Sequence, residues 1–146
     1  MTTSRTGTNT VGLTQDAGWE IGVSRTINAP LNAVWGYLTS PQGIDQWLGG
    51  GLTLPAEKGA TYTTPDGTSG ELRSFRPGDR IRLTWQPADW DHASTVQVAA
   101  RASGEKTVLR FHQERLADAS ERERQRTHWT SVMQAIVNEL TERAAD

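Results

Sequence analysis

The C-terminal part of the chain carries an apolar stripe at helical spacing. Asp118 or Ser120 is expected to cap the helix that this stripe predicts, because a glutamate follows each of them three residues later. One face of such a helix is apolar, so the preceding residues must supply a matching apolar surface. The stripe follows the positions i, i+3, i+4, i+7, i+8 and i+11, occupied by Trp129, Val132, Met133, Ile136, Val137 and Leu140.

The residues before this helix alternate between apolar and polar side chains, which predicts strands. In the clearest case Ile81, Leu83 and Trp85 point to one face and the residues between them to the other. The turn sequences PDG at 65–67 and PGD at 77–79 indicate hairpins. The predicted strands cover residues 19–27, 60–64, 69–76, 80–86, 94–102 and 106–114.

Two short helices are expected between the first strand and the hairpins. Pro30 suits an early position of the first helix, and Pro41 ends that helix. Ser40 and Pro41 are then the N-cap and the first position of the second helix. Ile44 and Trp47 lie on the apolar face of this second helix.

This order of elements indicates an α+β fold. A curved antiparallel β-sheet with one apolar face wraps around a long C-terminal α-helix, with two short helices after the first strand. A concave, mostly apolar site between sheet and helix is expected, and small ligands bind in such sites. Residues 1–12, rich in Thr, Ser, Asn and Gly, are assigned to a flexible N-terminal tail, and residues 13–146 to a single domain.

The composition narrows the class of partner. The chain has 146 residues, no Cys and a net charge of -2. The lack of Cys excludes disulfides and thiolate metal sites, and the charge is not that of a nucleic-acid binder. No run approaches the ~20 apolar residues of a membrane span, and the N-terminus lacks the apolar core of a secretory signal. We therefore expect a cytoplasmic protein with no nucleic-acid partner and no membrane span.

His112, Glu114 and His128 lie close together in the sequence and raise the question of a metal or catalytic site. Leu109 and Phe111 take the opposite face of the strand from His112 and Glu114. Because Leu109 and Phe111 form the stronger apolar pair, they are predicted to point inward and the two polar residues to face away. A zinc site needs at least three protein ligands, so we predict no metal and no cofactor.

Two polar segments each allow two interpretations. The charged run at 121–126 is a solvated helix face, stabilised by glutamate–arginine pairs three or four residues apart, or a patch that docks on a partner. The loop ADWDH at 88–92 is polar surface, or the rim of a site in which Asp89, Asp91 and His92 act in acid/base chemistry.

Four features follow one another along the chain. They are the motif A-P-x-x-x-V-W at 29–35, Trp47 at the end of the second short helix, Trp85 at the end of a strand, and Trp129 at the start of the apolar stripe. Together they resemble the START-like superfamily, also called SRPBCC or Bet v-like. Within it the chain is similar to the branch named after the C-terminal domain of the activator of the heat-shock protein 90 ATPase. The resemblance covers residues 19–143 and implies the helix-grip fold. The superfamily includes carriers of hydrophobic ligands, aromatic polyketide cyclases and cochaperones, so fold alone does not give the activity.

We therefore expect a non-enzymatic START-like domain that binds a hydrophobic or aromatic small molecule, oriented by Gln113, His128 or Arg73. The alternatives are a cochaperone-like protein that docks on a chaperone or another protein, and an enzyme of the polyketide cyclase/aromatase type. An exposed edge strand allows a homodimer as well as a monomer. The cavity is expected to be lined by Trp47, Leu83, Trp85, Leu109, Phe111, Gln113, His128, Trp129, Met133 and Ile136.

Overall fold

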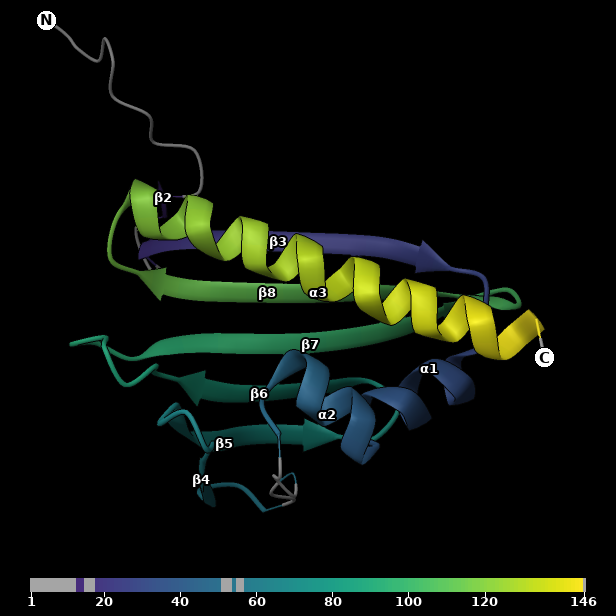
Figure 1. Cartoon of the computed structure of the whole chain (residues 1–146), viewed down its shortest axis with the longest axis horizontal. Helices are drawn as coiled ribbons and strands as arrows, with labels where there is room; N and C mark the ends of the chain where they lie inside the picture. The colour runs from purple at the N-terminus through teal and green to yellow at the C-terminus, as the bar shows by residue number, and fades with distance from the viewer. Residues whose placement is uncertain (1–12, 15–17, 51–53, 55–56, 146) are drawn as a thin grey trace, which may run out of the picture.

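The computed structural model describes residues 13–14, 18–50, 54 and 57–145 (Figure 1). The predicted flexible tail at 1–12 lies outside the described residues. In the described part, seven strands form one antiparallel sheet in the order β2-β3-β8-β7-β6-β5-β4. The strands are β2 (Leu13–Thr14), β3 (Gly18–Ile27), β4 (Thr61–Thr63), β5 (Ser69–Arg76), β6 (Arg80–Trp85), β7 (Ser94–Ser103) and β8 (Lys106–Leu116).

The predicted strands are confirmed, and the sheet has one addition. Residues 13–14 form a two-residue strand, β2, which pairs with the start of β3 through Leu13 and Trp19. Too few residues alternate there for the sequence pattern to indicate a strand. The central pairs β3·β8 and β7·β8 are long, because β7 and β8 have 10 and 11 residues.

The two short helices are α1 (Leu31–Leu38) and α2 (Pro41–Trp47). As predicted, the Ser40 hydroxyl caps α2 by accepting a hydrogen bond from the Gly43 N–H at 3.1 Å, with Pro41 in the first turn. The Trp47 indole N–H donates to the Leu38 carbonyl at 2.9 Å. This buried hydrogen bond fastens the end of α2 to the end of α1.

The long helix α3 (Ala119–Ala145) is capped by Asp118, one of the two predicted residues. The Glu121 N–H donates to Asp118 Oδ1 at 2.7 Å, and Glu121 Oε1 accepts from the Ala117 N–H at 3.0 Å. The bond to Asp118 satisfies a backbone donor that the first helical turn leaves unpaired, and the bond from Ala117 fixes the chain just before the cap.

Helix α3 runs across the sheet over β3 and β8, and α1 and α2 lie beside it on the same face (Figure 1). Leu109 and Phe111 point into this interior with 0% and 1% exposure, as the alternation of β8 predicted. Trp129 of α3 is 1% exposed and packs on Phe111. Among the described residues, no helix has the length and apolar content to cross a membrane.

We predict that Trp129→Ala lowers the free energy of unfolding by about 3–5 kcal/mol, because it removes a buried aromatic ring from the helix–sheet interface. Thr130→Ala is the control, since Thr130 is the exposed neighbour on the same helix. Urea denaturation of both variants measures the difference. Equal destabilisation by the two changes would contradict the helix–sheet packing described above.

Candidate ligand site between the sheet and the C-terminal helix

Nine of the ten residues predicted to line the cavity are buried on the inner side of the sheet, and the tenth, His128, is exposed. They come from α2, β6, β8 and α3. Strand alternation on β6 and β8 and the helical stripe on α3 bring them to one interior. The nine buried residues are Trp47, Leu83, Trp85, Leu109, Phe111, Gln113, Trp129, Met133 and Ile136.

Aromatic rings dominate the part of this interior beneath the first turns of α3. Trp129 stacks on Phe111 with ring centroids 4.8 Å apart and an interplanar angle of 18°. Trp85 lies 6.4 Å from Trp129 and stacks on His128 at 6.2 Å and 24°. Such contacts add to the area that the rings bury, and they hold the ring positions.

A chain of hydrogen bonds crosses this interior. The Trp129 indole N–H donates to Gln113 Oε1 at 2.8 Å, and Gln113 Nε2 donates to Ser94 Oγ at 2.9 Å. Ser94 Oγ in turn donates to the Trp85 carbonyl at 2.6 Å. Gln113, which we expected to orient a ligand, therefore already uses its carbonyl oxygen and its amide nitrogen within the protein. Buried polar groups need such partners, so these hydrogen bonds fix the position of α3 on the sheet.

One polar group in the same region is not satisfied. Trp85 is 9% exposed, and its indole N–H has no hydrogen-bond partner among the described residues. Trp90 packs edge-on against the Trp85 ring, with centroids 5.3 Å apart at 86°. A buried donor without an acceptor costs about 1–3 kcal/mol. This N–H is therefore available to an acceptor that enters the aromatic cluster formed by Trp85, Trp90, His128 and Trp129.

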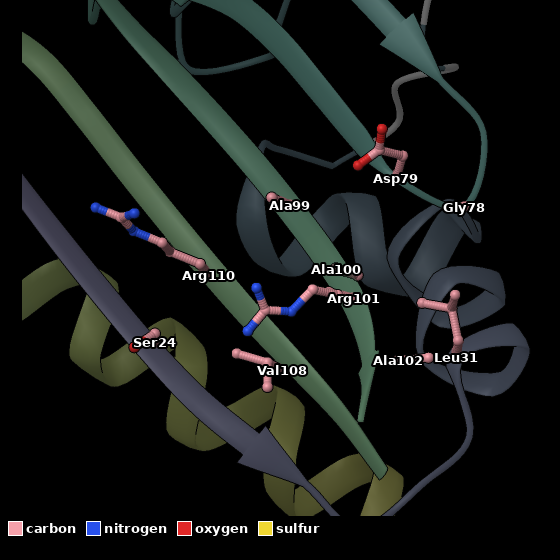
Figure 2. Close-up of a pocket in the computed structure, with 10 residues that line it drawn as sticks. All are labelled: Ser24, Leu31, Gly78, Asp79, Ala99, Ala100, Arg101, Ala102, Val108 and Arg110. Atoms are coloured by element: carbon pink, nitrogen blue, oxygen red, sulfur yellow. The ribbon is translucent and has the colours of Figure 1, made fainter. Parts of the chain in front are cut away.

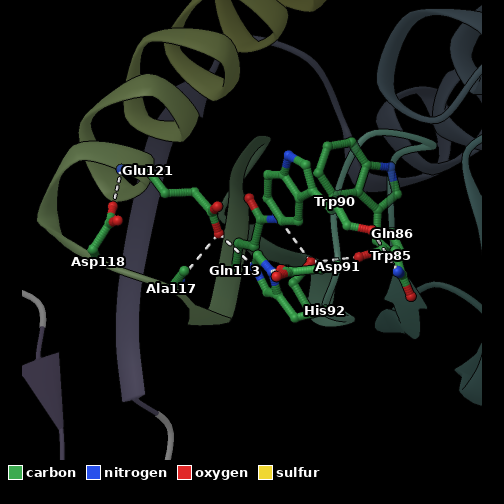
Figure 3. Close-up of polar contacts among 10 residues, drawn as sticks. Trp85, Gln86, Trp90, Asp91, His92, Gln113, Ala117, Asp118 and Glu121 are labelled. Atoms are coloured by element: carbon green, nitrogen blue, oxygen red, sulfur yellow. Dashed lines mark hydrogen bonds and ion pairs between the residues drawn. The ribbon is translucent and has the colours of Figure 1, made fainter.

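The β6–β7 loop closes one end of the cluster through His92 (Figure 3). The His92 ring stacks on Trp90 at 4.8 Å and 14°. His92 Nε2 lies 2.7 Å from Glu121 Oε1, and His92 Nδ1 lies 3.0 Å from Asp91 Oδ1. This contact between His92 and Glu121, called the His92–Glu121 tie below, joins the loop to the first turn of α3.

The contacts of the His92 ring shift the pKa values of His92 and Asp91. The hydrogen bond to Asp91 raises the pKa of His92, and Glu121 raises it further against the opposing effect of burial. The same hydrogen bond from His92 lowers the pKa of Asp91, whose side chain is exposed. Of the three residues predicted at this rim, Asp89 is exposed and lies outside the tie, His92 forms the tie, and Asp91 contacts the other ring nitrogen of His92. Glu121 was expected on a solvated helix face, but it is 6% exposed and faces His92.

His128 and Arg73 differ from each other in placement. One face of the His128 ring packs against Trp85 and Trp129, and the loss of water there lowers the pKa of His128. Its imidazole is therefore neutral near pH 7. Arg73 lies on β5, is exposed and pairs with Glu71 at 3.2 Å. Arg73 therefore lies on the surface and not in the interior where we expected it to orient a ligand.

His112 and Glu114 lie on the outer side of the sheet, as predicted. His112 Nε2 is 3.1 Å from Glu20 Oε1, and Glu114 forms an ion pair with Arg82. Glu20, His112 and Glu114 place one possible metal-ligand atom each within 4.8 Å of one another. The sheet therefore brings Glu20, which the sequence did not indicate, next to the other two. Because the Arg82 guanidinium already neutralises Glu114, we interpret the group as a set of surface ion pairs.

A long C-terminal helix held in a curved antiparallel sheet, with two short helices after the first long strand, defines the helix-grip fold of START-like proteins. The family model described as Activator of Hsp90 ATPase homolog 1-like protein matches residues 28–141. The chain belongs to this family. A comparison with curated proteins found no match.

Solved structures share the fold at low identity. DynU16, described as a protein in the dynemicin biosynthetic locus, is 22% identical with a TM-score of 0.70, and the match covers 84% of this chain and 47% of DynU16. An HSP90 activator from Plasmodium falciparum is 19% identical with a TM-score of 0.64, covering 77% of this chain and 88% of that chain. The Aha1 dimer from Colwellia psychrerythraea is 13% identical with a TM-score of 0.67, covering 83% of this chain and 95% of that chain. This chain thus spans about half the length of DynU16.

We predict that His92, through its contacts with Asp91 and Glu121, makes stability depend on pH. Because the folded pKa of His92 is raised above its ordinary 6.5, the protonated ring stabilises the fold below that pH, and the stabilisation is lost as pH rises through the raised pKa. His92→Gln removes this contribution. The difference in unfolding free energy between the wild type and His92→Gln should therefore shrink between pH 6 and pH 8.5.

Urea denaturation at several pH values measures this difference. His128 contributes with the opposite sign in the same range because its pKa is lowered, and comparison with His92→Gln cancels that contribution. Asp89→Asn is the matched control, since it changes a charge in the same loop but leaves the tie intact. A difference between wild type and His92→Gln that does not change with pH would refute the role of the tie.

Proposed function

We propose that this chain is a non-enzymatic binding domain for a planar aromatic or hydrophobic small molecule that carries a hydrogen-bond acceptor. The site is the aromatic cluster of Trp85, Trp90, His128 and Trp129. The observation that carries the proposal is the buried Trp85 indole N–H, which has no acceptor among the described residues. Ligand sites are mostly apolar with a few polar groups that fix orientation, and this cluster has that character.

The aromatic rings supply the contact area. Trp85 and Trp90 meet edge to face, and Trp85 and His128 lie nearly parallel, so a planar ligand has ring faces and edges to pack against. A carbonyl or ether oxygen on that ligand accepts the Trp85 N–H. The family membership supports this proposal because START-like proteins include carriers of hydrophobic ligands.

Binding is favoured over catalysis by the arrangement of titratable groups. His128 borders the cluster, and no carboxylate bonds to it in the described part of the chain. The carboxylates of Asp91 and Glu121 are engaged by His92 at the rim. A cyclase or aromatase needs acid and base groups that converge on a substrate, and these groups are directed at each other.

Protein docking is the second candidate, favoured by a groove along α3. The groove has a volume of about 570 Å³ and an exposed polar lining that includes Glu123, Arg126 and Gln134. One structure of the same fold is titled an HSP90 activator. The interior site is preferred because it has a buried polar atom, the Trp85 indole N–H, without a hydrogen-bond partner in the part of the chain that the structure describes. Among the described residues, those that line the groove have no such atom.

We predict that 2-acetylnaphthalene, which has a carbonyl acceptor, binds more tightly than 2-ethylnaphthalene, which has none. Trp85→Phe keeps a ring and removes the N–H, so it should weaken binding of the ketone about fivefold and leave the hydrocarbon nearly unchanged. Quenching of tryptophan fluorescence measures both affinities. Trp19→Phe is the control, because Trp19 lies on β3 near the sheet edge.

Two results would overturn the proposal. One is that the two naphthalenes bind equally to the wild type. The other is that Trp19→Phe and Trp85→Phe weaken the ketone by the same factor. If neither compound binds and the purified protein instead binds a chaperone through residues of the α3 groove, docking replaces the carrier role.

A further inference from the structure

A cavity lies on the other side of the sheet, away from α3. It has a volume of about 590 Å³, within the range of about 300–1,000 Å³ that is typical of ligand sites. Residues of β3, β7 and β8 that point outward form its floor, and the β5–β6 turn and the start of α1 form its far wall. It shares no residue with the aromatic cluster, so it is a separate candidate site.

Two arginines dominate the floor of this outer cavity. Arg101 of β7 lies opposite Val108 in the β7·β8 register, and Arg110 lies opposite Ala99. The guanidinium of Arg101 lies between Arg110 and Val108 in the view of Figure 2. Both arginines are exposed, and neither has an ion-pair or hydrogen-bond partner in the part of the chain that the structure describes.

The local backbone makes room for Arg110. A Cβ added to Gly22 on the neighbouring strand would lie 2.9 Å from Arg110 Nη2. The guanidinium therefore rests against the bare backbone of β3 at Gly22. This contact directs the charge of Arg110 along the sheet surface and not straight out into solvent.

The remaining lining is apolar except for one carboxylate. Val108, Ala99 and Leu31 offer apolar surface beside the arginines. Asp79 lies across β7 from the two guanidinium groups, at the β5–β6 turn (Figure 2). Asp79 repels a second negative charge on any anion held by Arg101 and Arg110.

We propose that this outer cavity binds a small organic molecule with one carboxylate and an apolar body. The planar guanidinium of arginine matches a carboxylate with two parallel hydrogen bonds. Arg101 and Arg110 hold the carboxylate, and Val108, Ala99 and Leu31 contact the apolar body. Asp79 selects a monocarboxylate over a dicarboxylate.

The test is a titration of isotope-labelled protein with 4-phenylbutyrate, followed by the NMR shifts of the backbone amides. The neutral analogue 4-phenylbutanol has the same apolar body and lacks the charge. We expect saturable shifts of Gly22, Ala99 and Val108 with the carboxylate and none with the alcohol. Arg101→Gln and Arg110→Gln should each weaken binding about tenfold, as expected for loss of a charge-assisted hydrogen bond.

Two further variants sharpen the result. Arg126→Gln removes the same charge from an exposed position on α3 and should leave the affinity unchanged. Gly22→Ala keeps every charge but displaces the Arg110 guanidinium, so it should weaken binding, although less than Arg110→Gln. Thermal unfolding of each variant confirms that the fold is retained, which exposed arginines permit.

Any of three outcomes would overturn the proposal. The first is that the alcohol binds as tightly as the carboxylate. The second is that Arg101→Gln and Arg110→Gln retain wild-type affinity. The third is that the NMR shifts fall on residues of the α3 side of the sheet. The last outcome assigns the compound to the interior site. The carboxylate probe and the naphthalene probes therefore test the two sites independently.

Discussion

Helix α3 is held on the sheet by the contacts of Trp129 with Phe111 and Gln113. Trp129 stacks on Phe111 and donates its indole N–H to Gln113, so one side chain combines apolar burial with a directional hydrogen bond. Stacking alone permits the helix to slide along the sheet, whereas the hydrogen bond selects one position because a shift leaves two buried polar groups unpaired. The position of α3 then determines where His128 and Glu121 lie. Because Glu121 contacts His92, it also determines where the β6–β7 loop is attached.

The two faces of the sheet have separate chemistry, because successive residues of a strand point to opposite sides. On β8, Phe111 and Gln113 serve the interior, while Arg110 and His112 serve the outer face. The interior is aromatic and holds a buried N–H that has no acceptor among the residues that the structure describes. The outer face carries guanidinium groups and neighbouring carboxylates. The two proposed sites therefore differ in the polar group that they offer a ligand, which is an indole N–H in the interior and guanidinium groups on the outer face.

Periodicity predicted the elements of this fold apart from β2, because the patterns that specify them are local in sequence. The inward positions of Leu109 and Phe111 followed from alternation together with their apolar character, and so did the outward position of His112. The tie between His92 and Glu121 could not be predicted, since these residues are 29 positions apart and meet only through the shape of a loop. The approach of Glu20 to His112 also escaped prediction, because it depends on strand register and on a bulge between Trp19 and Ile21.

We propose that the aromatic cluster beneath α3 binds a small aromatic molecule whose acceptor atom accepts the Trp85 N–H. Native mass spectrometry of the protein purified from its own source detects such a molecule. We expect a bound species that adds the mass of a small aromatic molecule with an oxygen or nitrogen acceptor and that dissociates on collisional activation. The bare protein mass under gentle ionisation, or a bound aliphatic molecule that lacks an acceptor, would contradict it.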